Sequence, residues 1–179
     1  MKYNVSVREL KESDIPLIIN YWYNADDIFL MKLGVDINKI PSEKVWRSML
    51  VEQIAQPYTN KKSYYIIWEF DGKPAGHSHV NKIIFGREAY MHLHLWNHEA
   101  RQLGYGTELV KMTLPYFFEN LKLKYLYCEP YALNPPPNKT LSKIGFEFIK
   151  EHITIPGFLN FEQKVNLWLL TSEKFKKLA

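Results

Sequence analysis

The segment over residues 89–118 constrains the fold most, because an expected strand passes through a short glycine-containing loop into an expected helix. Gly104 and Gly106 let the backbone turn tightly and approach a ligand. The start of a helix carries free N–H groups and a partial positive charge, so it can hold a diphosphate. A plain strand-to-helix turn that needs two glycines explains the pattern equally well. The loop is neither a Walker loop nor the three-glycine dinucleotide fingerprint, since neither spacing is present.

Periodicity and turn residues place the other elements. Apolar alternation and β-branched runs predict strands at 5–10, 63–70, 74–84, 89–96, 122–128, 146–154 and 165–170. Helical spacing predicts one helix capped by Ser13, one opened by Pro41 and Ser42, one after Gly106 that Pro115 should kink or shorten, and one ending near Ile144 before Gly145. A loop through Asp26, Asp27 and Gly34 separates the first two helices. The order β-α-α-β-β-β-α-β-α-β-β predicts an α/β (α+β) fold, a mixed sheet with helices on both faces.

Composition narrows the class of protein. The chain has 179 residues, 46% apolar and 23% charged, which excludes a disordered chain, a collagen and a coiled coil and favours one domain over 1–179. The net charge, 23 − 19 = +4, is too diffuse to indicate nucleic-acid binding but suits an anionic cofactor. No apolar run reaches membrane-spanning length, and the first ten residues do not resemble a signal peptide. We expect a cytoplasmic protein without an intrachain disulfide, since Cys128 is the single cysteine.

Two motifs carry a family resemblance. Arg101-x-x-Gly104-x-Gly106 resembles the (Arg/Gln)-x-x-Gly-x-(Gly/Ala) motif of the GNAT superfamily of acyl-CoA-dependent N-acyltransferases. The block from Asn134 to Lys143-Ile144-Gly145-Phe146 resembles the next conserved segment of that superfamily, and the element order matches its fold from end to end. The RimJ/RimL-type branch is the most similar. The resemblance implies a mostly antiparallel twisted sheet with a splayed central strand pair, and acetyl-CoA as acyl donor.

The same resemblance implies where acetyl-CoA would bind. Leu95 and Trp96, with His94 beside them, would follow the pantetheine arm, and Asn134 and Asn138 would contact it. Both asparagines could instead cap a helix beside the proline run. The loop would hold the pyrophosphate, mainly through backbone amides, over Arg101, Gln102, Leu103, Gly104, Tyr105, Gly106 and Thr107.

Two His-x-His pairs supply candidate acid–base groups. His77 and His79 share one face of their strand, as do His92 and His94, and antiparallel pairing of the two strands could bring all four together. Tyr90 lies on the same face as His92 and His94. His92 is similar in position to a water-linked histidine of arylalkylamine acetyltransferases, so we expect it to act as the base, assisted by His94. Packed histidines with satisfied nitrogens are the alternative.

The sequence departs from the family at the acid that protonates the thiolate. The usual Tyr position is Leu141, and the RimJ/RimL-type Ser position is Pro137. Tyr90, Tyr131, Ser142 and water remain candidates. Cys128 is better explained as a small core residue than as a nucleophile.

The acceptor site rests on weaker signals. Glu129, at the mouth of the expected splay, could bind a cationic amine or relay a proton, or could be a surface carboxylate. Trp22, Tyr23, Asp26 and Asp27 fall where family members build the acceptor pocket, although a solvated loop explains the two aspartates as well. The acceptor is then a small amine or a peptide N-terminus, and a homodimer is possible through exposed aromatic residues of the last strand.

Three functions compete. The first is an acetyl-CoA-dependent N-acetyltransferase acting by direct attack of the amine. The second is a CoA-binding or partner-binding module without catalysis, which the missing thiolate acid would explain. The third is a metal-dependent protein using His77, His79, His92 and His94, since imidazoles at i and i+2 of a strand can share a metal. The third would leave the glycine loop and the Asn134 block without a role, so we predict no metal.

Overall fold

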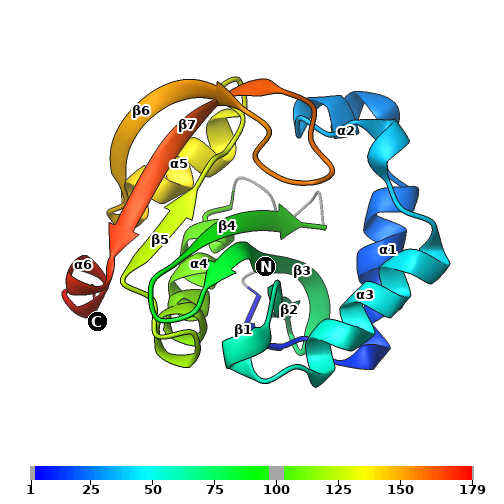
Figure 1. Cartoon of the computed structure of the whole chain (residues 1–179), viewed down its shortest axis with the longest axis horizontal. Helices are drawn as coiled ribbons and strands as arrows, with labels where there is room; N and C mark the ends of the chain where they lie inside the picture. Colours follow the sequence, from blue (N-terminus) through cyan, green and yellow to red (C-terminus); the bar gives the residue numbers. More distant parts are fainter. Residues whose placement is uncertain (1–2, 97–102, 179) are drawn as a thin grey trace.

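The strands form one sheet. The computed structural model describes residues 3–96 and 103–178, and its seven-stranded sheet has the order β1-β2-β3-β4-β5-β7-β6 (Figure 1). The strands are β1 (Val5–Glu9), β2 (Tyr64–Phe70), β3 (Lys73–Ile84), β4 (Glu88–Leu95), β5 (Tyr125–Cys128), β6 (Glu147–Thr154) and β7 (Gln163–Thr171). All neighbours are antiparallel except β4 and β5, which are parallel. The predicted mixed, mostly antiparallel sheet is confirmed.

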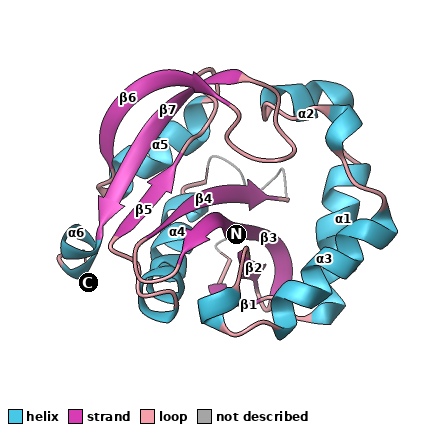
Figure 2. Cartoon of the chain, viewed as in Figure 1, coloured by secondary structure: helices cyan, strands magenta, loops and turns pink. Residues whose placement is uncertain are grey.

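The helices cover both faces of the sheet, as predicted. They are α1 (Ile15–Tyr23), α2 (Asp27–Lys32), α3 (Glu43–Ala55), α4 (Tyr105–Pro115), α5 (Pro135–Ile144) and α6 (Ser172–Lys176). Figure 2 shows α1 and α3 together at one side of the molecule, whereas α4 and α5 lie behind β4 and β5. Among the described residues, no helix combines the length and the hydropathy that a bilayer crossing requires.

Alternation along β2 explains the two layers. Ile66 and Trp68 point into the core that includes residues of α4 and α5, whereas Tyr65 and Ile67 point into the core formed with α1 and α3. Successive strand side chains face opposite sides, so a strand with helices on both faces is apolar throughout. This is why β2 is apolar from Tyr64 to Trp68, before Glu69 near its end.

Two short helices were not predicted. The segment expected to be a loop contains α2, where the Asp26 carboxylate accepts a hydrogen bond from Phe29 N over 2.8 Å. The helix α6 begins after Thr171, whose hydroxyl accepts a hydrogen bond from Lys174 N. Both helices are about one to two turns long, too short to show a clear apolar period. Capping bonds, rather than periodicity, define them.

Other boundaries also differ from expectation. Ser13 does not cap α1, because it lies in a 3-10 turn over Glu12–Asp14 that precedes the helix. Lys122 adopts a positive φ of 55°, so the chain is still turning and β5 begins at Tyr125. Pro115 ends α4 as predicted, and a π-helical turn follows.

Candidate active site

The sheet opens between β4 and β5. Their parallel pairing ends at Met91 and Cys128, whereas β4 continues to Leu95. Beyond β5 the chain follows β7, where Asn166 N donates to the carbonyl oxygen of Pro130 over 3.1 Å. The expected splay of the central strand pair is therefore present, and a backbone edge of β4 faces the opening.

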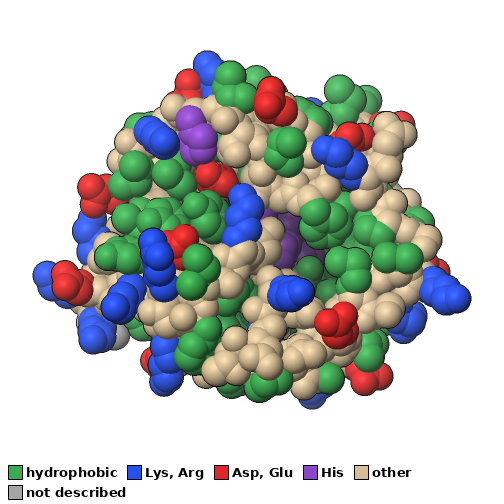
Figure 3. Space-filling view, in the orientation of Figure 1, with side chains coloured by type: hydrophobic (Ala, Val, Ile, Leu, Met, Phe, Trp, Pro, Cys, Tyr) green, Lys and Arg blue, Asp and Glu red, His purple; other side chains and the backbone are tan. Residues whose placement is uncertain are grey.

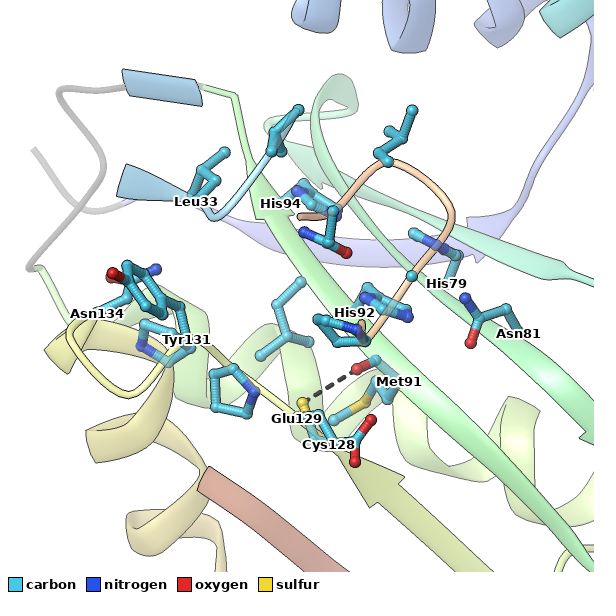
Figure 4. Close-up of a pocket in the computed structure, with 18 of the residues that line it drawn as sticks. Leu33, His79, Asn81, Met91, His92, His94, Cys128, Glu129, Tyr131 and Asn134 are labelled. Atoms are coloured by element: carbon cyan, nitrogen blue, oxygen red, sulfur yellow. Dashed lines mark hydrogen bonds between the residues drawn. The ribbon is translucent and has the colours of Figure 1, made fainter. Parts of the chain in front are cut away.

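A pocket of about 100 Å³ lies at this opening. Its walls come from β4, from the segment after β5, and from the loop between β6 and β7. Figure 4 shows His92 and His94 on the β4 side of the pocket, with Tyr131 and Asn134 on the segment after β5. On the molecular surface, Figure 3 shows histidine side chains at the bottom of a hollow near the middle of the face.

The register of β3 and β4 brings four histidines together, as predicted. His77 pairs with His94, and His79 pairs with His92. The ring centroids are 4.7 Å apart in each pair. The histidines lie on the face covered by α1, where Trp22 packs edge-on against His94 at 4.8 Å.

Burial keeps these imidazoles neutral. The pKa values of His77 and His79 lie well below the ordinary 6.5, because burial disfavours the charged ring and neighbouring histidines repel it. Burial, together with the positive charge of Lys82, lowers the pKa of His92 to about 4. Near pH 7 each of the three rings therefore has one N–H and one lone pair.

A hydrogen bond opposes the metal hypothesis. Ring nitrogens of His77, His79 and His94 lie within 4.8 Å of one another, a grouping that could hold an ion. However, the indole N–H of Trp96 donates to Nδ1 of His77 over 2.9 Å. The proton of neutral His77 is then on Nε2, so this ring has no free lone pair, whereas a metal-ligating histidine normally donates its other N–H.

Tyr90 does not join the histidines, contrary to expectation. Its ring stacks on Tyr127 with centroids 5.1 Å apart, and the ammonium of Lys82 lies 4.7 Å from its centroid. Tyr90 is absent from the described residues that line the pocket. The contacts with Tyr127 and Lys82 hold the Tyr90 ring outside the pocket, although Tyr90 lies on the same face of β4 as His92.

The predicted pyrophosphate loop is only partly described, since Arg101 and Gln102 lie outside the described residues. Leu103 is exposed, and Gly104 precedes α4 with a φ of +89°. Among the described residues, a Cβ at Gly104 would meet no atom within 4 Å, and one at Gly106 would meet Thr140 alone. The N–H of Thr107 donates to the carbonyl oxygen of Gly104 over 3.2 Å, which closes the first turn of α4. A phosphate group at this helix start would meet no described side chain at Gly104.

Tyr105, between the two glycines, has a structural role through its side chain. Its side chain is buried, and its hydroxyl accepts a hydrogen bond from Tyr3 N over 2.9 Å. It also packs against Phe70. The Tyr105 side chain therefore anchors α4 to the sheet, so only its backbone is available to a ligand.

Leu95 is the last residue of β4 and Trp96 follows it, and neither is among the described residues that line the pocket. Trp96 N donates to the carbonyl oxygen of Ala75 over 2.8 Å, and the indole binds His77. Across the opening, Asn134 lines the pocket at the start of α5, and its side chain caps no backbone group of the helix. Of these three predicted cofactor contacts, Asn134 alone is among the described residues that line the pocket.

Asn138 has a structural role that corrects the expectation of direct cofactor contact. Its amide donates to the carbonyl oxygens of Asn134 and Tyr131. Its oxygen accepts from the side chains of Asn166 and Trp168, both at 2.9 Å. With all four hydrogen-bonding positions filled, Asn138 fixes the segment after β5 to β7.

Of the residues predicted to bind the acceptor amine near α1 and α2, one lines the pocket and the others are not among its described lining residues. Trp22 is buried and lines the pocket. Tyr23 is half exposed, and its hydroxyl donates to the carbonyl oxygen of Pro41. Asp26 caps α2, and neither it nor Tyr23 is among the described lining residues. Trp22 therefore belongs to the pocket, while Tyr23 and Asp26 stabilise the elements around it.

Glu129 lies in the pocket wall with two partners that were not predicted. Its side chain is 7% exposed, and Oε1 lies 3.2 Å from Nε2 of His152 on β6. Oε2 is 3.8 Å from Nζ of Lys82, which has a positive φ of 48° at an irregularity in β3. Neither partner follows from sequence spacing, because three separate strands or loops contribute one residue each.

The loop between β6 and β7 forms the roof of the pocket, which was also not predicted. A Cβ at Gly157 would lie 3.4 Å from Cε1 of His92, so this glycine covers the histidine closely. The loop is tied to the segment after α2, where Asp36 N donates to the carbonyl oxygen of Leu159 and the amide of Gln163 donates to that of Gly34. The sequence pattern at Pro156-Gly157 predicts only a turn.

The residues considered as the acid that protonates the thiolate differ in whether they line the pocket. Tyr131 and Pro137 line the pocket. Leu141 is fully buried, and Ser142 is exposed and absent from the described lining. Cys128 is buried, donates to the carbonyl oxygen of Met91 over 3.0 Å, and has a raised pKa because of its burial. It is a core residue as predicted, not an activated nucleophile.

Comparison with known proteins agrees with this geometry. The family model described as an acetyltransferase (GNAT) domain matches residues 4–147. A search of curated protein sequences finds no match to the chain. The solved structures show what the fold is similar to.

Three of these structures illustrate the similarity. Spermidine N-acetyltransferase from Vibrio cholerae, solved with CoA and spermine, has a TM-score of 0.77 at 17% identity, covering 96% of this chain and 98% of that one. RimL, a ribosomal L7/L12 α-N-protein acetyltransferase solved with CoA, has a TM-score of 0.75 at 13% sequence identity, and the match covers 95% of each chain. An aminoglycoside acetyltransferase solved with CoA has a TM-score of 0.73 at 15% sequence identity, and the match covers 97% of this chain and 98% of that one.

At these identities the solved structures establish the fold, and the family model establishes the relationship. The family model covers most of the chain, including the glycine loop and the Asn134 block. The RimJ/RimL-type branch stays a prediction. The chain belongs to the GNAT family of acetyltransferases, enzymes that transfer an acetyl group from acetyl-CoA to an amine.

Proposed function

We propose that this protein transfers the acetyl group of acetyl-CoA to a primary amine by direct attack, with His92 as the base. The observation that carries the proposal is that His92, a neutral histidine, lies in the pocket at the point where β4 separates from β5. The start of α4 is not among the described residues that line this pocket, and we expect the pyrophosphate to bind at that helix start. Acetyl-CoA supplies an activated thioester carbonyl. The start of α4 would bind the pyrophosphate, and the edge of β4 near Leu95 would align the pantetheine arm.

Proton balance defines what the residues must do. A protonated amine has three N–H bonds and the product amide has one, so two protons leave the nitrogen. One must leave before attack, because only the neutral amine has a free electron pair. The other leaves as the C–N bond forms and the C–S bond breaks. In this proposal, Nε2 of His92, buried without a hydrogen-bond partner, receives that second proton, directly or through one water.

His92 also answers the question of the missing thiolate acid. Burial lowers the pKa of His92 to about 4, so the imidazolium that forms during the reaction is a strong acid. A free thiol has a pKa of about 8.5, so the transfer from imidazolium to the departing thiolate is strongly downhill. We therefore infer that His92 returns the proton, assisted by its neighbour His94, and that a tyrosine at position 141 is not needed.

Two variants of His92 test this role. We expect His92→Ala and His92→Gln to lower kcat about 100-fold, because general acid–base catalysis typically contributes that much or more. The acetyl-CoA Kd, measured by calorimetry, should stay within about threefold, since the side chain carries no part of the α4 site. The Gln variant keeps side-chain volume and polarity, so its inactivity separates proton transfer from packing. A kcat within twofold of the parent in both variants would exclude His92 as the base.

The main alternative is a CoA-binding module without catalysis. It predicts that acetyl-CoA binds while no amine supports release of free thiol. A zinc titration tests the metal hypothesis in the same experiment, which the hydrogen bond between Trp96 and His77 leads us to expect to be negative. The single-domain organisation over 1–179, the cytoplasmic location and the homodimer stay predictions.

A further inference from the structure

The pocket contains a buried carboxylate, one oxygen of which has no hydrogen-bond partner among the described residues. Glu129 is 7% exposed at its side chain, and Oε2 has no hydrogen-bond partner in the described structure. Lys82 approaches this oxygen only to 3.8 Å, beyond hydrogen-bond distance. His152 holds the other oxygen at 3.2 Å. A buried acceptor without a partner is costly, so this oxygen indicates a ligand that donates hydrogen bonds.

The other unused oxygen atoms on the pocket wall are acceptors as well. Oδ1 of Asn81 and Oε1 of Gln163 are buried without partners, and both residues line the pocket. The orientation of Gln163 follows from its amide nitrogen, which donates to Gly34. A primary ammonium has three N–H donors and no acceptor, so it complements such a wall.

The charge of the pocket limits the acceptor to one positive group. Glu129 is the one acidic residue among the described residues that line the pocket. The ammonium of Lys82 already lies 3.8 Å from this carboxylate, so a second positive charge on the acceptor would find no second carboxylate among the described lining residues. Asp26, which could have attracted such a charge, caps α2 outside the pocket.

The rest of the pocket suits an apolar body. Its walls include the side chains of Trp22, Leu33, Val35, Tyr131, Phe158 and Leu159. Polyamine chains and aminoglycosides carry several cationic or hydroxyl groups, and those that meet these apolar side chains, rather than the oxygens of Glu129, Asn81 and Gln163, would lose water without gaining partners. An aromatic or aliphatic group would instead gain from burial there.

We propose that the acceptor is a singly charged primary amine on an apolar or aromatic body, and that Glu129 binds its ammonium group. This inference rests on the proposed function and names its substrate class. Two sources share this chemistry, a small arylalkylamine and a peptide N-terminus with an apolar first residue. His152 beside Glu129 holds the carboxylate in place.

An acceptor series tests the inference. The probes are 2-phenylethylamine, a tripeptide amide with N-terminal Leu and no charged side chain, spermidine and kanamycin, each assayed by release of free thiol from acetyl-CoA. We expect kcat/KM for one of the first two to exceed that for spermidine and kanamycin at least tenfold, and the preferred one identifies the source. Higher kcat/KM for spermidine or kanamycin overturns the inference.

Variants of Glu129 give a second, independent result. In Glu129→Gln we expect the KM for the preferred amine to rise at least tenfold, while the acetyl-CoA Kd changes less than twofold. Glu129→Asp keeps the charge and should recover part of the loss. Glu173→Gln removes a carboxylate from the exposed surface of α6 and should leave both values unchanged. An unchanged KM in Glu129→Gln overturns the assignment.

The two proposals fail in different ways. If the chain is not an acetyltransferase, acetyl-CoA does not bind, or no amine releases thiol. If only the acceptor inference is wrong, acetyl-CoA binds and thiol is released, but with a polycation as the better acceptor. Calorimetric titration of the CoA-loaded protein with 2-phenylethylamine and spermidine separates binding from turnover, since it needs no chemistry.

Discussion

At the scale of single residues, Gly34 is the described glycine with the least space for a side chain. Its φ is +74°, and a Cβ there would lie 1.9 Å from Oε1 of Gln163. Gly34 also accepts hydrogen bonds from the side chains of Asn160 and Gln163 through its carbonyl oxygen. The residue thus joins the segment after α2 to the roof of the pocket.

We expect Gly34→Ala to lower the free energy of unfolding by about 2–4 kcal/mol. A positive φ costs an alanine about 1 kcal/mol, and displacement of a buried side chain adds about 1–3 kcal/mol. Chemical denaturation monitored by tryptophan fluorescence measures the change. The KM for the acceptor amine should rise as well, because the roof moves.

Gly86→Ala is the matched control for this residue. Gly86 has a φ of +77°, but a Cβ there would meet nothing within 4 Å. It therefore carries the backbone cost without the collision. Equal losses of stability in the two variants would show that the contact with Gln163 does not matter.

At the scale of elements, the start of α4 and the separation of β4 from β5 act together. The helix begins after Gly104, which has a φ of +89°, and a Cβ at this glycine would meet no described atom within 4 Å. The strands separate beyond Met91 and Cys128, where the chain after β5 leaves β4 and stays beside β7. The helix start and the part of β4 beyond its pairing with β5 are the two features that the proposed donor site would use.

We expect Gly104→Glu to abolish measurable acetyl-CoA binding. The change places bulk and a negative charge where the pyrophosphate would bind, and a carboxylate there would repel the phosphates and compete with them for the helix dipole. Calorimetry with acetyl-CoA measures the Kd, which should rise at least 100-fold.

The change Gly72→Glu controls for backbone strain in this experiment. Gly72 has a φ of +73°, and a Cβ there would also meet no atom within 4 Å, but this glycine lies in the turn between β2 and β3. The Kd of this variant for acetyl-CoA should match that of the parent. If Gly104→Glu binds as well as Gly72→Glu, acetyl-CoA does not use the start of α4.

At the scale of the whole molecule, the buried histidines link stability to pH. In the folded protein the pKa values of His77, His79 and His92 lie below 6.5, whereas in the unfolded chain they return to about 6.5. Between pH 6.5 and about 4 the unfolded chain therefore binds more protons than the folded one. Stability must fall as the pH falls through this window.

We expect the free energy of unfolding to decrease from pH 7 to pH 5, by up to about 1.4 kcal/mol per pH unit for each of these histidines. Denaturation curves at several pH values measure the slope. The variant His79→Gln should show a shallower slope, since one proton-binding group is lost. A free energy of unfolding that is constant over this range would contradict the neutral, buried state of the cluster.

Much of the molecule could be predicted from local patterns. Strand alternation, the positions of glycine and proline, and the motif from Arg101 to Gly106 depend on residues within one or two turns of each other. The meeting of His77 with His94 also followed, because consecutive antiparallel strands have few possible registers. The short helix α2 escaped prediction, because one capping aspartate decides it.

The sequence by itself thus determined the strands, the longer helices and the mixed sheet that they form, because alternation and turn signals depend on neighbouring residues. The location of the donor site stays a prediction from the same sequence. Only the tertiary structure decided which side chains complete the pocket. Glu129 meets His152 and Lys82 from two other strands, and Gly34 meets Gln163 across 129 residues of chain. It also decided that Asn138 fixes the segment after β5 to β7. Such contacts join residues distant in sequence, and burial and the field of neighbouring charges exist only once the chain has folded.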